Sequence, residues 1–310
     1  MTVNEIYAEW FKIKRYQVKE SSLATYVMAW RTHIQEEFGS REYSDIRMSD
    51  IQAFVNKMIS NGLSVKTVKD QVMIIKMILL WAQEEYSLLP IPGRRNLIYP
   101  TSAKSGQNDL CTLASAEQKA IVNYCKENIS PSNVAIMMTL STGLRIGEVC
   151  GIKFSDFDLK EGTLTINRTV MRVYSADPGE KKTRVIIGTP KTLSSHRTIP
   201  IPATLLREIK KWAAIYKPDY FLASAAEKPL EPRRLRNVFN GICESAGVKH
   251  IKFHGLRHTF ATTLLENKVD IKTTSELLGH SDVSITMDVY MHPSSEHKKR
   301  AIKVMDTLFR

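Results

Sequence analysis

Residues 254–290 read HGLRHTFATTLLENKVDIKTTSELLGHSDVSITMDVY, a helical pattern that carries four side chains with the chemistry of a reactive site. His254 and Arg257 are three residues apart, so they lie on one face of the first predicted helix. His280 stands beside a helix–helix turn, and Tyr290 follows one short helix later. The segment therefore predicts an arginine, two imidazoles and a phenol on neighbouring helices.

Two segments upstream add two further cations. Arg145 lies in STGLRIGEVCG (residues 141–151), just after a tight Thr-Gly turn. Lys191 lies in TPKTLSSHRTIPIP (residues 189–202), at the predicted tip of a β-hairpin. Taken singly, each residue has an ordinary explanation: most arginines are surface charges, most hairpin lysines are solvated, and most tyrosines near helix ends are half-buried. Their joint appearance in this order changes the interpretation.

These residue types suit phosphodiester transesterification without a metal. Two arginines bind the non-bridging oxygens and neutralise the charge of the transition state. A lysine on a hairpin protonates the leaving 5′ oxygen, and imidazoles bind the phosphate or accept the proton of the nucleophile. A phenol attacks in line and forms a covalent ester with the DNA. Because that ester conserves the bond energy, rejoining needs no ATP.

Other kinds of site fit the sequence less well. His254 and His258 form an H-x-x-x-H pair that could bind zinc on a helix, but Gly255 stands where an HExxH site has its glutamate, and no third ligand is near. TGLRIG lacks the GK[ST] of a nucleotide-binding loop. The sequence has no GxSxG elbow and no acidic cluster typical of a two-metal nuclease. Neither a metal nor a cofactor is predicted.

The net charge favours a polyanionic partner. The 310 residues carry a formal charge of +12 with a pI near 9.4, which attracts nucleic acid through long-range fields and counterion release. Between Thr163 and Pro200, seven Lys and Arg stand against two Asp and Glu. A basic protein without a nucleic-acid partner is the alternative, and charge alone does not decide between the two.

The cysteines and the N-terminus constrain the class of protein. The four cysteines are scattered without a CxxC pair, which argues against a disulfide framework and a cysteine zinc site, and fits a reducing cytosol. The N-terminus is amphipathic and lacks the apolar core of a signal peptide. No stretch approaches the roughly 18 uncharged apolar residues of a membrane span. We expect a soluble, cytoplasmic protein.

The first 88 residues are predicted to form a bundle of four helices. Apolar residues recur at three- and four-residue spacing, first from Ile6 to Ile13 and then from Leu23 to Trp30. Serines that can bind an amide of the first turn, and glycines that can end a helix, mark the other boundaries. The predicted N-caps of the second, third and fourth helices are Ser22, Ser49 and Ser64, and the predicted stops are Gly39 and Gly62.

A basic connection and a mixed domain follow. Residues 90–107, PIPGRRNLIYPTSAKSGQ, are typical of a linker, which either lies along a phosphate backbone or is a solvated tether. Helices are predicted at Ala114–Asn128 and Ser132–Leu140, and again from Pro202 onward with a stop at Gly279. The intervening β-rich runs are TLTIN (163–167), TVMRVY (169–174), TRVIIG (183–188) and HRTIPI (196–201).

On these residues the chain resembles the tyrosine recombinase family, which includes the integrases of phages and conjugative transposons. The family's signature is Arg…Lys…His-x-x-Arg…His/Trp…Tyr, and TGLRIGEV, HGLRHTFAT and LLGHSDVSIT…Y are phrases typical of it. The resemblance covers essentially the whole chain. The signature falls on Arg145, Lys191, His254, Arg257, His280 and Tyr290. Glu148, one turn after Arg145, either orients that arginine by ion pairing or is an acid favoured by the helix macrodipole.

The resemblance implies a mainly α fold with a small β-region (α+β) in three parts. Residues 1–88 are expected to form a four-helix, SAM-like core-binding domain and residues 89–108 a basic linker. Residues 109–310 are expected to form a mixed catalytic domain that ends in an exchange helix. The implied activity is cleavage and rejoining of DNA through a 3′-phosphotyrosine intermediate on Tyr290, which integrates or excises a mobile element.

The resemblance also implies partners. Double-stranded DNA with core-type recombination sites is expected to lie in a clamp formed by the two domains, with four protomers on two duplexes. An excisionase or a host DNA-bending protein is a further expected partner, and the location is the bacterial nucleoid in the cytoplasm. The apolar tail HPSSEHKKRAIKVMDTLFR (residues 292–310) docks on a neighbouring protomer or packs on its own domain.

Two features refine the subtype, and two rival functions stay open. TPKTLSSHRTIPI resembles integrases of phages and conjugative transposons more than chromosome-dimer resolvases. The chain begins with the expected core-binding domain, so either an arm-binding domain is absent from its subgroup or the sequence starts late. The rivals are a catalytically silent DNA-binding regulator and a type IB topoisomerase-like enzyme. The complete residue set speaks against the first, and the separate core-binding domain and tail against the second.

Overall fold

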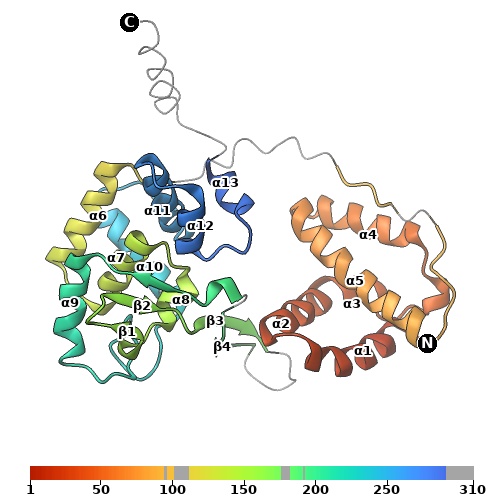
Figure 1. The fold of residues 1–310 in the computed structure, drawn as a ribbon. Helices are drawn as coiled ribbons and strands as arrows, with labels where there is room; N and C mark the ends of the chain where they lie inside the picture. The colour runs from red at the N-terminus through yellow and green to blue at the C-terminus, as the bar shows by residue number, and fades with distance from the viewer. Residues whose placement is uncertain (94–95, 101–111, 176–181, 191–192, 291–310) are drawn as a thin grey trace, which may run out of the picture. The chain divides into compact units, whose positions relative to one another are not determined.

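The structure is a computed structural model that describes residues 1–93, 96–100, 112–175, 182–190 and 193–290 (Figure 1). Side chains are described for these residues except Leu193 and residues 288–290. No helix within the described ranges combines the length and the apolar character that crossing a membrane requires.

The chain divides into two compact units, which we treat separately. Unit 1 comprises Met1–Gln107 and Val173–Arg184, and unit 2 comprises Asn108–Arg172 and Val185–Arg310. The predicted linker bounds, residues 89–108, stay a prediction.

Unit 1 is a helical bundle, as the apolar spacing predicted. Its second helix continues through a π-helical turn at Trp30–Ile34 into a short helix that ends before Gly39. Aliphatic side chains make up most of the core, and the ring of the partly buried Tyr7 stacks on that of Trp30 with centroids 4.0 Å apart. The helices are α1 (Val3–Gln17), α2 (Glu20–Ala29), α3 (Gln35–Phe38), α4 (Met48–Ser60) and α5 (Val65–Glu85) (Figure 1).

The predicted N-cap serines of this bundle are correct at one of three helices. Ser64 caps α5, where its hydroxyl accepts from the amide of Thr67. Ser22 is not a cap, because its own amide already donates to the carbonyl of Lys19 inside α2. Ser49 is not a cap either: the N-cap residue of α4 is Arg47, two residues earlier, and its amide donates to the carboxylate of Asp50 at 2.6 Å. An acid in the first turn has thus replaced the serine hydroxyl.

Unit 2 is mixed, with eight α-helices of six residues or more and several short strands among its described residues. The helices are α6 (Ser115–Glu127), α7 (Pro131–Thr142), α8 (Ile146–Gly151), α9 (Ala203–Ala213), α10 (Pro232–Ser245), α11 (His254–Glu266), α12 (Ile271–Leu278) and α13 (Ser284–Tyr290). Its strands are β1 (Phe157–Asp158), β2 (Thr163–Thr165) and β5 (Thr198–Pro200). Two further strands, β3 (Thr169–Tyr174) and β4 (Thr183–Gly188), belong in part to unit 1, which includes the last two residues of β3 and the first two of β4.

The four predicted β-rich runs are strands in the structure. β1, β2 and β5 form an antiparallel sheet in that order, with Leu164 of β2 opposite Ile199 of β5, and β3 pairs with β4. Both of these apolar residues are buried in the core of unit 2. The predicted mainly α fold with a small β-region is therefore confirmed.

Helix α7 is the central helix of unit 2. It is apolar around its circumference and packs against α6, α8, α9, α10 and α11, as a helix buried on all sides must. It ends at Gly143, whose φ of +67° is the left-handed conformation that glycine adopts without strain. Because the chain turns sharply there, only Leu144 separates this turn from Arg145, the N-cap residue of α8.

Candidate active site

The site is built at the C-terminal end of α12. Gly279 has a φ of +65° and ends this helix. The amides of Gly279 and His280 fold back onto carbonyls of the last turn at 3.0 and 3.1 Å, in the pattern of a Schellman motif. The carbonyls of Leu277, Leu278 and Gly279 therefore stay available beyond the helix end, where the macrodipole is negative. Such an end is a good binding place for cations.

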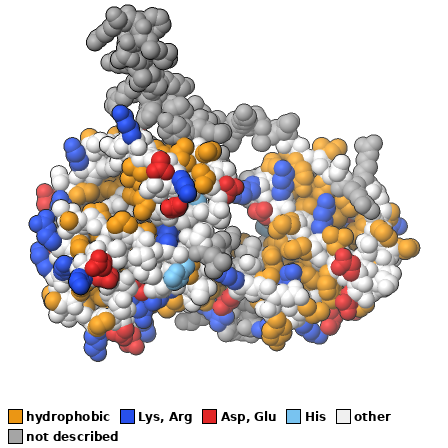
Figure 2. All heavy atoms as spheres, in the orientation of Figure 1, with side chains coloured by type: hydrophobic (Ala, Val, Ile, Leu, Met, Phe, Trp, Pro, Cys, Tyr) orange, Lys and Arg blue, Asp and Glu red, His pale blue; other side chains and the backbone are white. Residues whose placement is uncertain are grey.

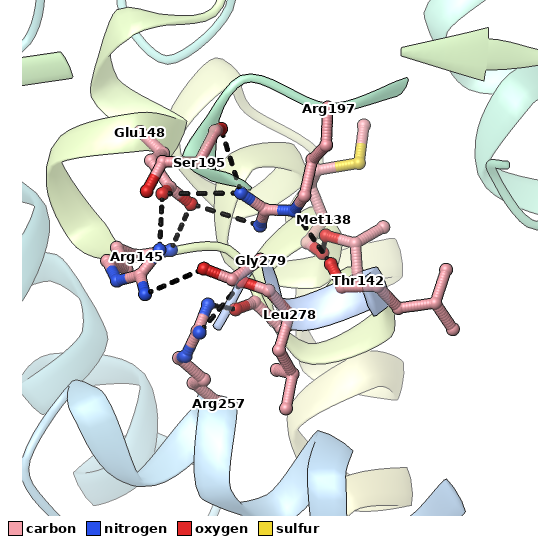
Figure 3. Close-up of polar contacts among 11 residues, drawn as sticks. Met138, Thr142, Arg145, Glu148, Ser195, Arg197, Arg257, Leu278 and Gly279 are labelled. Atoms are coloured by element: carbon pink, nitrogen blue, oxygen red, sulfur yellow. Dashed lines mark hydrogen bonds and ion pairs between the residues drawn. The ribbon is translucent and has the colours of Figure 1, made fainter. Parts of the chain in front are cut away.

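Three arginines from three different parts of unit 2 occupy this helix end (Figure 3). Each donates to a different carbonyl, and the three carbonyls are consecutive in sequence. The hydrogen bonds run from Arg197 Nε to Leu277 O at 2.8 Å, from Arg257 Nη2 to Leu278 O at 2.8 Å, and from Arg145 Nη2 to Gly279 O at 3.3 Å. The helix end thus sets the spacing of the guanidinium groups.

A single buried carboxylate joins two of these arginines. Glu148 Oε1 lies 2.8 Å from Nη1 of Arg145, and Glu148 Oε2 lies 3.2 Å from Nη2 of Arg197. Burial alone would raise the pKa of Glu148, but the charges of Arg197 and Arg145 and the amide of Arg145 outweigh it, so the pKa is lowered. Glu148 is therefore an anion that holds two cations in place.

Both readings of Glu148 that the sequence allowed hold at once. Its carboxylate accepts from the backbone amide of Arg145 at 3.0 Å, as an acid in the first turn of α8 can, and it also pairs with the guanidinium of the same residue. Backbone and side chain of Arg145 are thus held by one group. The Arg145 side chain keeps 37% of its surface exposed, more than either of the other two arginines.

Arg257 lies in the first turn of α11 and is 3% exposed. Besides the bond to α12, its Nη1 donates to the carbonyl of Gly143 at 2.8 Å. Arg257 therefore ties the end of α7 to the end of α12. Burial, together with the charge of Arg145, lowers the pKa of Arg257 to about 9, which leaves the guanidinium charged at neutral pH.

The two predicted imidazoles are neutral at pH 7. Burial and then the charges of His258, Arg257 and Arg145 lower the pKa of His254 to about 4. Burial and then the neighbouring arginines lower the pKa of His280 to about 4 as well. Nδ1 of His280 lies 2.8 Å from the hydroxyl of Thr286 in α13, which fixes the ring. Neutral imidazoles can both donate and accept a hydrogen bond.

The H-x-x-x-H pair forms a ring contact instead of a recognisable metal centre. The rings of His254 and His258 meet edge to face with centroids 4.6 Å apart. Across the described residues, no group of three His, Cys, Asp or Glu side chains is arranged to hold a metal ion.

The described structure brings together four of the six residues that match the signature: Arg145, His254, Arg257 and His280. Lys191 lies outside the described residues. Tyr290 is the last residue of α13, and its side chain lies outside the described part. The roles of all six residues stay predictions.

Arg197 is the functional candidate that the sequence did not single out. It lies in the quoted phrase TPKTLSSHRTIPI, next to β5, and its side chain is 8% exposed. An arginine beside a strand resembles a surface charge in sequence. Only the buried carboxylate of Glu148 and the end of α12, far away along the chain, identify it as part of the site.

Two models of protein families match the sequence. The phage integrase family model matches residues 112–297, and the model of the phage integrase N-terminal SAM-like domain matches residues 2–59. A tyrosine recombinase XerC-like protein of Caldanaerobacter subterraneus is 30% identical over 100% of this chain and 84% of its own length. The integrase of Staphylococcus phage L54a is 28% identical over 56% of this chain and 51% of its own length.

Solved structures show the same fold. An integrase of transposon Tn1549, in complex with transposon right end DNA, superposes with a TM-score of 0.75 at 21% identity, over 99% of this chain and 100% of that one. A lambda integrase tetramer bound to a Holliday junction superposes with a TM-score of 0.65 at 20% identity, over 93% of this chain and 77% of that one. With the family model covering more than half of the sequence, the chain belongs to the phage integrase family of tyrosine recombinases.

Proposed function

We propose that this site-specific DNA recombinase cleaves one DNA strand with Tyr290, holds it as a 3′-phosphotyrosine ester, and rejoins it to a new partner. The observation that carries the proposal is the arrangement of Arg145 and Arg257, whose guanidinium groups are held on neighbouring carbonyls of one helix end. Two fixed guanidinium groups suit the non-bridging oxygens of a phosphate, because their charge does not have to reorganise as the transition state forms.

The charge balance of the site supports a phosphate as ligand. The site holds three arginines and one carboxylate, so Arg145, Arg197, Arg257 and Glu148 together carry a net charge of +2. A buried surplus of positive charge is costly unless a partner neutralises it. A phosphodiester, whose charge grows in the transition state, supplies that partner at the step where stabilisation raises the rate.

The remaining roles follow from what each residue type can do. In the proposal, neutral His254 and His280 exchange hydrogen bonds with the phosphate and with the nucleophile. Lys191 protonates the leaving 5′ oxygen. The phenol oxygen of Tyr290 forms the new bond to phosphorus as the bond to the 5′ oxygen breaks, and rejoining reverses both changes. The reaction consumes no cofactor in this scheme.

The proposed substrate is double-stranded DNA bearing core-type sites, and the proposed role is integration or excision of a mobile element. The similarity to a phage integrase and to the fold of a transposon integrase supports this role. Figure 2 shows Lys and Arg side chains spread over the visible face of each unit, which suits binding to a phosphate backbone. A homotetramer on DNA is also proposed, with support from the lambda integrase tetramer on a Holliday junction. An excisionase or a host DNA-bending protein is proposed as accessory partner.

The proposal is tested with nicked duplexes that carry a pool of candidate core sites. The nick lets the cleaved fragment diffuse away, so a covalent protein–DNA ester accumulates and is seen on a denaturing gel. We expect an adduct with the wild type and none with Tyr290→Phe, while a native gel shows equal binding by both. Sequencing the trapped DNA then gives the site.

Each other outcome identifies an alternative. An adduct that persists in Tyr290→Phe overturns the assignment of the nucleophile. A shift on the native gel without any adduct, across a pool that includes the ends of mobile elements flanking the gene, favours a silent DNA-binding regulator. Relaxation of supercoiled plasmid without dependence on sequence favours a type IB topoisomerase-like enzyme.

A further inference from the structure

We propose that Arg197 is a positioning residue for strand cleavage, which fixes Arg145 through Glu148 and fixes the turn before His280 through the carbonyl of Leu277. The inference rests on the proposed function, because it assigns Arg145 and His280 to the phosphate. It goes beyond that function by adding a buried arginine that does not need to touch the DNA.

The first argument is the set of partners that Arg197 holds at once. Both of its terminal nitrogens face Glu148: Nη2 lies 3.2 Å from Oε2 and Nη1 lies 3.4 Å from Oε1 (Figure 3). Nε donates to the carbonyl of Leu277 at 2.8 Å, and Nη1 to the carbonyl of Ser195 at 3.2 Å. The planar guanidinium therefore connects three separate segments of unit 2, which a single-point cation such as lysine cannot do.

The second argument is that the backbone of Arg197 is itself anchored. Its carbonyl accepts from the amide of Ile166 at 2.9 Å, and the next residue, Thr198, begins β5 and pairs with Thr165 of β2. The guanidinium therefore projects from the edge of a sheet whose register is fixed. If Glu148 or the turn after α12 moved away from this sheet, its hydrogen bond to Arg197 would break, because the anchored backbone of Arg197 prevents the guanidinium from following.

The third argument separates positioning from direct binding. The side chain of Arg197 is 8% exposed, whereas that of Arg145 is 37% exposed. Arg145 has an exposed surface that can meet a phosphate, and Arg197 lies on the other side of the shared carboxylate (Figure 3). Arg197 acts through its neighbours: Glu148 pairs with it at one side and with Arg145 at the other.

A matched control exists in the same unit. Arg168 pairs with the buried carboxylate of Asp156 at 2.5 Å and donates to the carbonyl of Gly151 at 3.2 Å. It is thus another partly buried arginine that joins a carboxylate to a backbone carbonyl, but its partners are not those of the site. Arg168→Met measures the cost of losing such an ion pair in unit 2.

The first experiment measures single-turnover cleavage of the nicked site and the affinity for the same DNA. We expect Arg197→Met to lower the cleavage rate about 100-fold, as misplacement of a reacting group by about 1 Å does, while DNA affinity changes by less than about threefold, since the residue is buried. Arg197→Lys keeps the positive charge but loses the planar guanidinium with its several donors, so we expect the cleavage rate to fall at least about tenfold. Arg168→Met is expected to lower the melting temperature as much as Arg197→Met without the loss of rate.

A double-mutant comparison tests whether Arg197 acts through Glu148. In a Glu148→Gln background, Arg197→Met is expected to lower the rate by clearly less than its loss of about 100-fold in the wild type, because the link to Arg145 is already lost and only the bond to the carbonyl of Leu277 remains to be removed. Equal losses in both backgrounds, or a full rate in Arg197→Met, overturn the proposal. Equal rate losses in Arg197→Met and Arg168→Met also overturn it, because they indicate general destabilisation.

A second readout needs no DNA and so separates this inference from the proposed cleavage. In protein labelled with ¹⁵N-arginine, the guanidinium signal of Arg145 is expected to shift and its rotation about Nε–Cζ to accelerate in Arg197→Met, but not in Arg168→Met. If the wild type forms no adduct, the proposed function fails, and this signal still decides on the positioning role. An unchanged Arg145 signal in Arg197→Met overturns it.

Discussion

Gly279 leaves the space that Arg197 occupies. A Cβ placed on Gly279 would lie 2.8 Å from Nη1 and 2.9 Å from Cδ of Arg197, and 2.7 Å from the carbonyl oxygen of Ser194. The same glycine has a φ of +65° and ends α12 so that its last carbonyls face the arginines. One residue without a side chain thus meets two separate requirements: a left-handed turn and close approach of a buried guanidinium.

Gly279→Ala is therefore expected to destabilise unit 2 more than a left-handed conformation alone would. That conformation costs an alanine roughly 1–2 kcal/mol, and overpacking adds about 1–3 kcal/mol. Gly247→Ala is the control, since Gly247 has a φ of +63° with nothing within 4 Å of the added Cβ. Urea unfolding of both variants gives the comparison. An equal shift of the two midpoints would mean that the turn relaxes and that Arg197 is not held as tightly as its contacts suggest.

The turn at Gly279 and the helices α6 and α7 were predictable because their signals are local, although α7 continues two residues past the predicted Leu140. A glycine that follows a helical pattern of apolar residues predicts a helix end, and a histidine and an arginine three residues apart predict a shared helix face. Both predictions use only residues that are close together in the sequence. That Arg145, Arg257 and His280 belong to one site was implied by the resemblance to the family's signature and by no local pattern. Even locally, competition between capping groups defeats prediction, as Asp50 shows by displacing Ser49 as the group that begins α4.

The role of Arg197 was not predictable because its partners are distant in sequence. Glu148 is 49 residues away and Leu277 is 80 residues away, so no local pattern marks the arginine as buried. Burial of a cation depends on whether the fold brings a carboxylate and free helix-end carbonyls to the same place. That arrangement is a property of the tertiary structure, and no local feature around residue 197 shows that this arginine is buried.

Glu148→Gln is expected to lower the free energy of unfolding at neutral pH and to make that free energy less dependent on pH in the acidic range. The pKa of Glu148 is lowered in the folded chain, because its ion pairs outweigh burial. A depressed carboxyl pKa contributes stability above the unfolded value of about 4.3, and this contribution is lost as pH falls toward the folded pKa. Removing one partner of a buried ion pair costs about 3–5 kcal/mol, so we expect a difference of that order at pH 7 that narrows toward pH 3.

Urea unfolding between pH 7 and pH 3 checks this, with the exposed Glu161→Gln as control for the loss of one negative charge. A difference between wild type and Glu148→Gln that stays constant over the whole range would contradict the pairing. So would a Glu148→Gln variant as stable as the control at pH 7.

His280 is expected to titrate far below an ordinary histidine. Burial, followed by the charges of Arg257, Arg145 and Arg197, lowers its pKa to about 4, against about 6.5 in the unfolded chain. Between these values the unfolded state binds more protons, so this residue's contribution to stability falls as pH decreases through that window. An NMR titration of the ring carbon signals measures the midpoint directly. Arg145→Ala removes one of the causes and should raise the pKa of His280, and a wild-type midpoint near 6.5 would show that the ring is solvated.

DNA affinity is expected to depend steeply on salt. Each phosphate neutralised by Lys or Arg contributes about −0.9 to the slope of log affinity against log salt. If the basic stretch between Thr163 and Pro200 lies on DNA, five contacts or more give a slope of about −4.5 or steeper. Replacing one contacting cation, for which the exposed Lys182 is a candidate, should reduce the slope by about one and weaken all sequences alike.

The dependence of DNA affinity on salt also distinguishes the buried cation Arg197 from exposed cations such as Lys182, which are candidates for contact with DNA. Arg197 is buried and paired with Glu148, so Arg197→Met should leave the slope unchanged even though it slows cleavage. Lys182→Ala should do the opposite, lowering the slope while leaving the cleavage rate at saturating DNA intact. A flat slope in the wild type would mean that the excess charge faces solvent. A slope that falls with Arg197→Met would mean that this arginine reaches the DNA, and its role would then be direct binding.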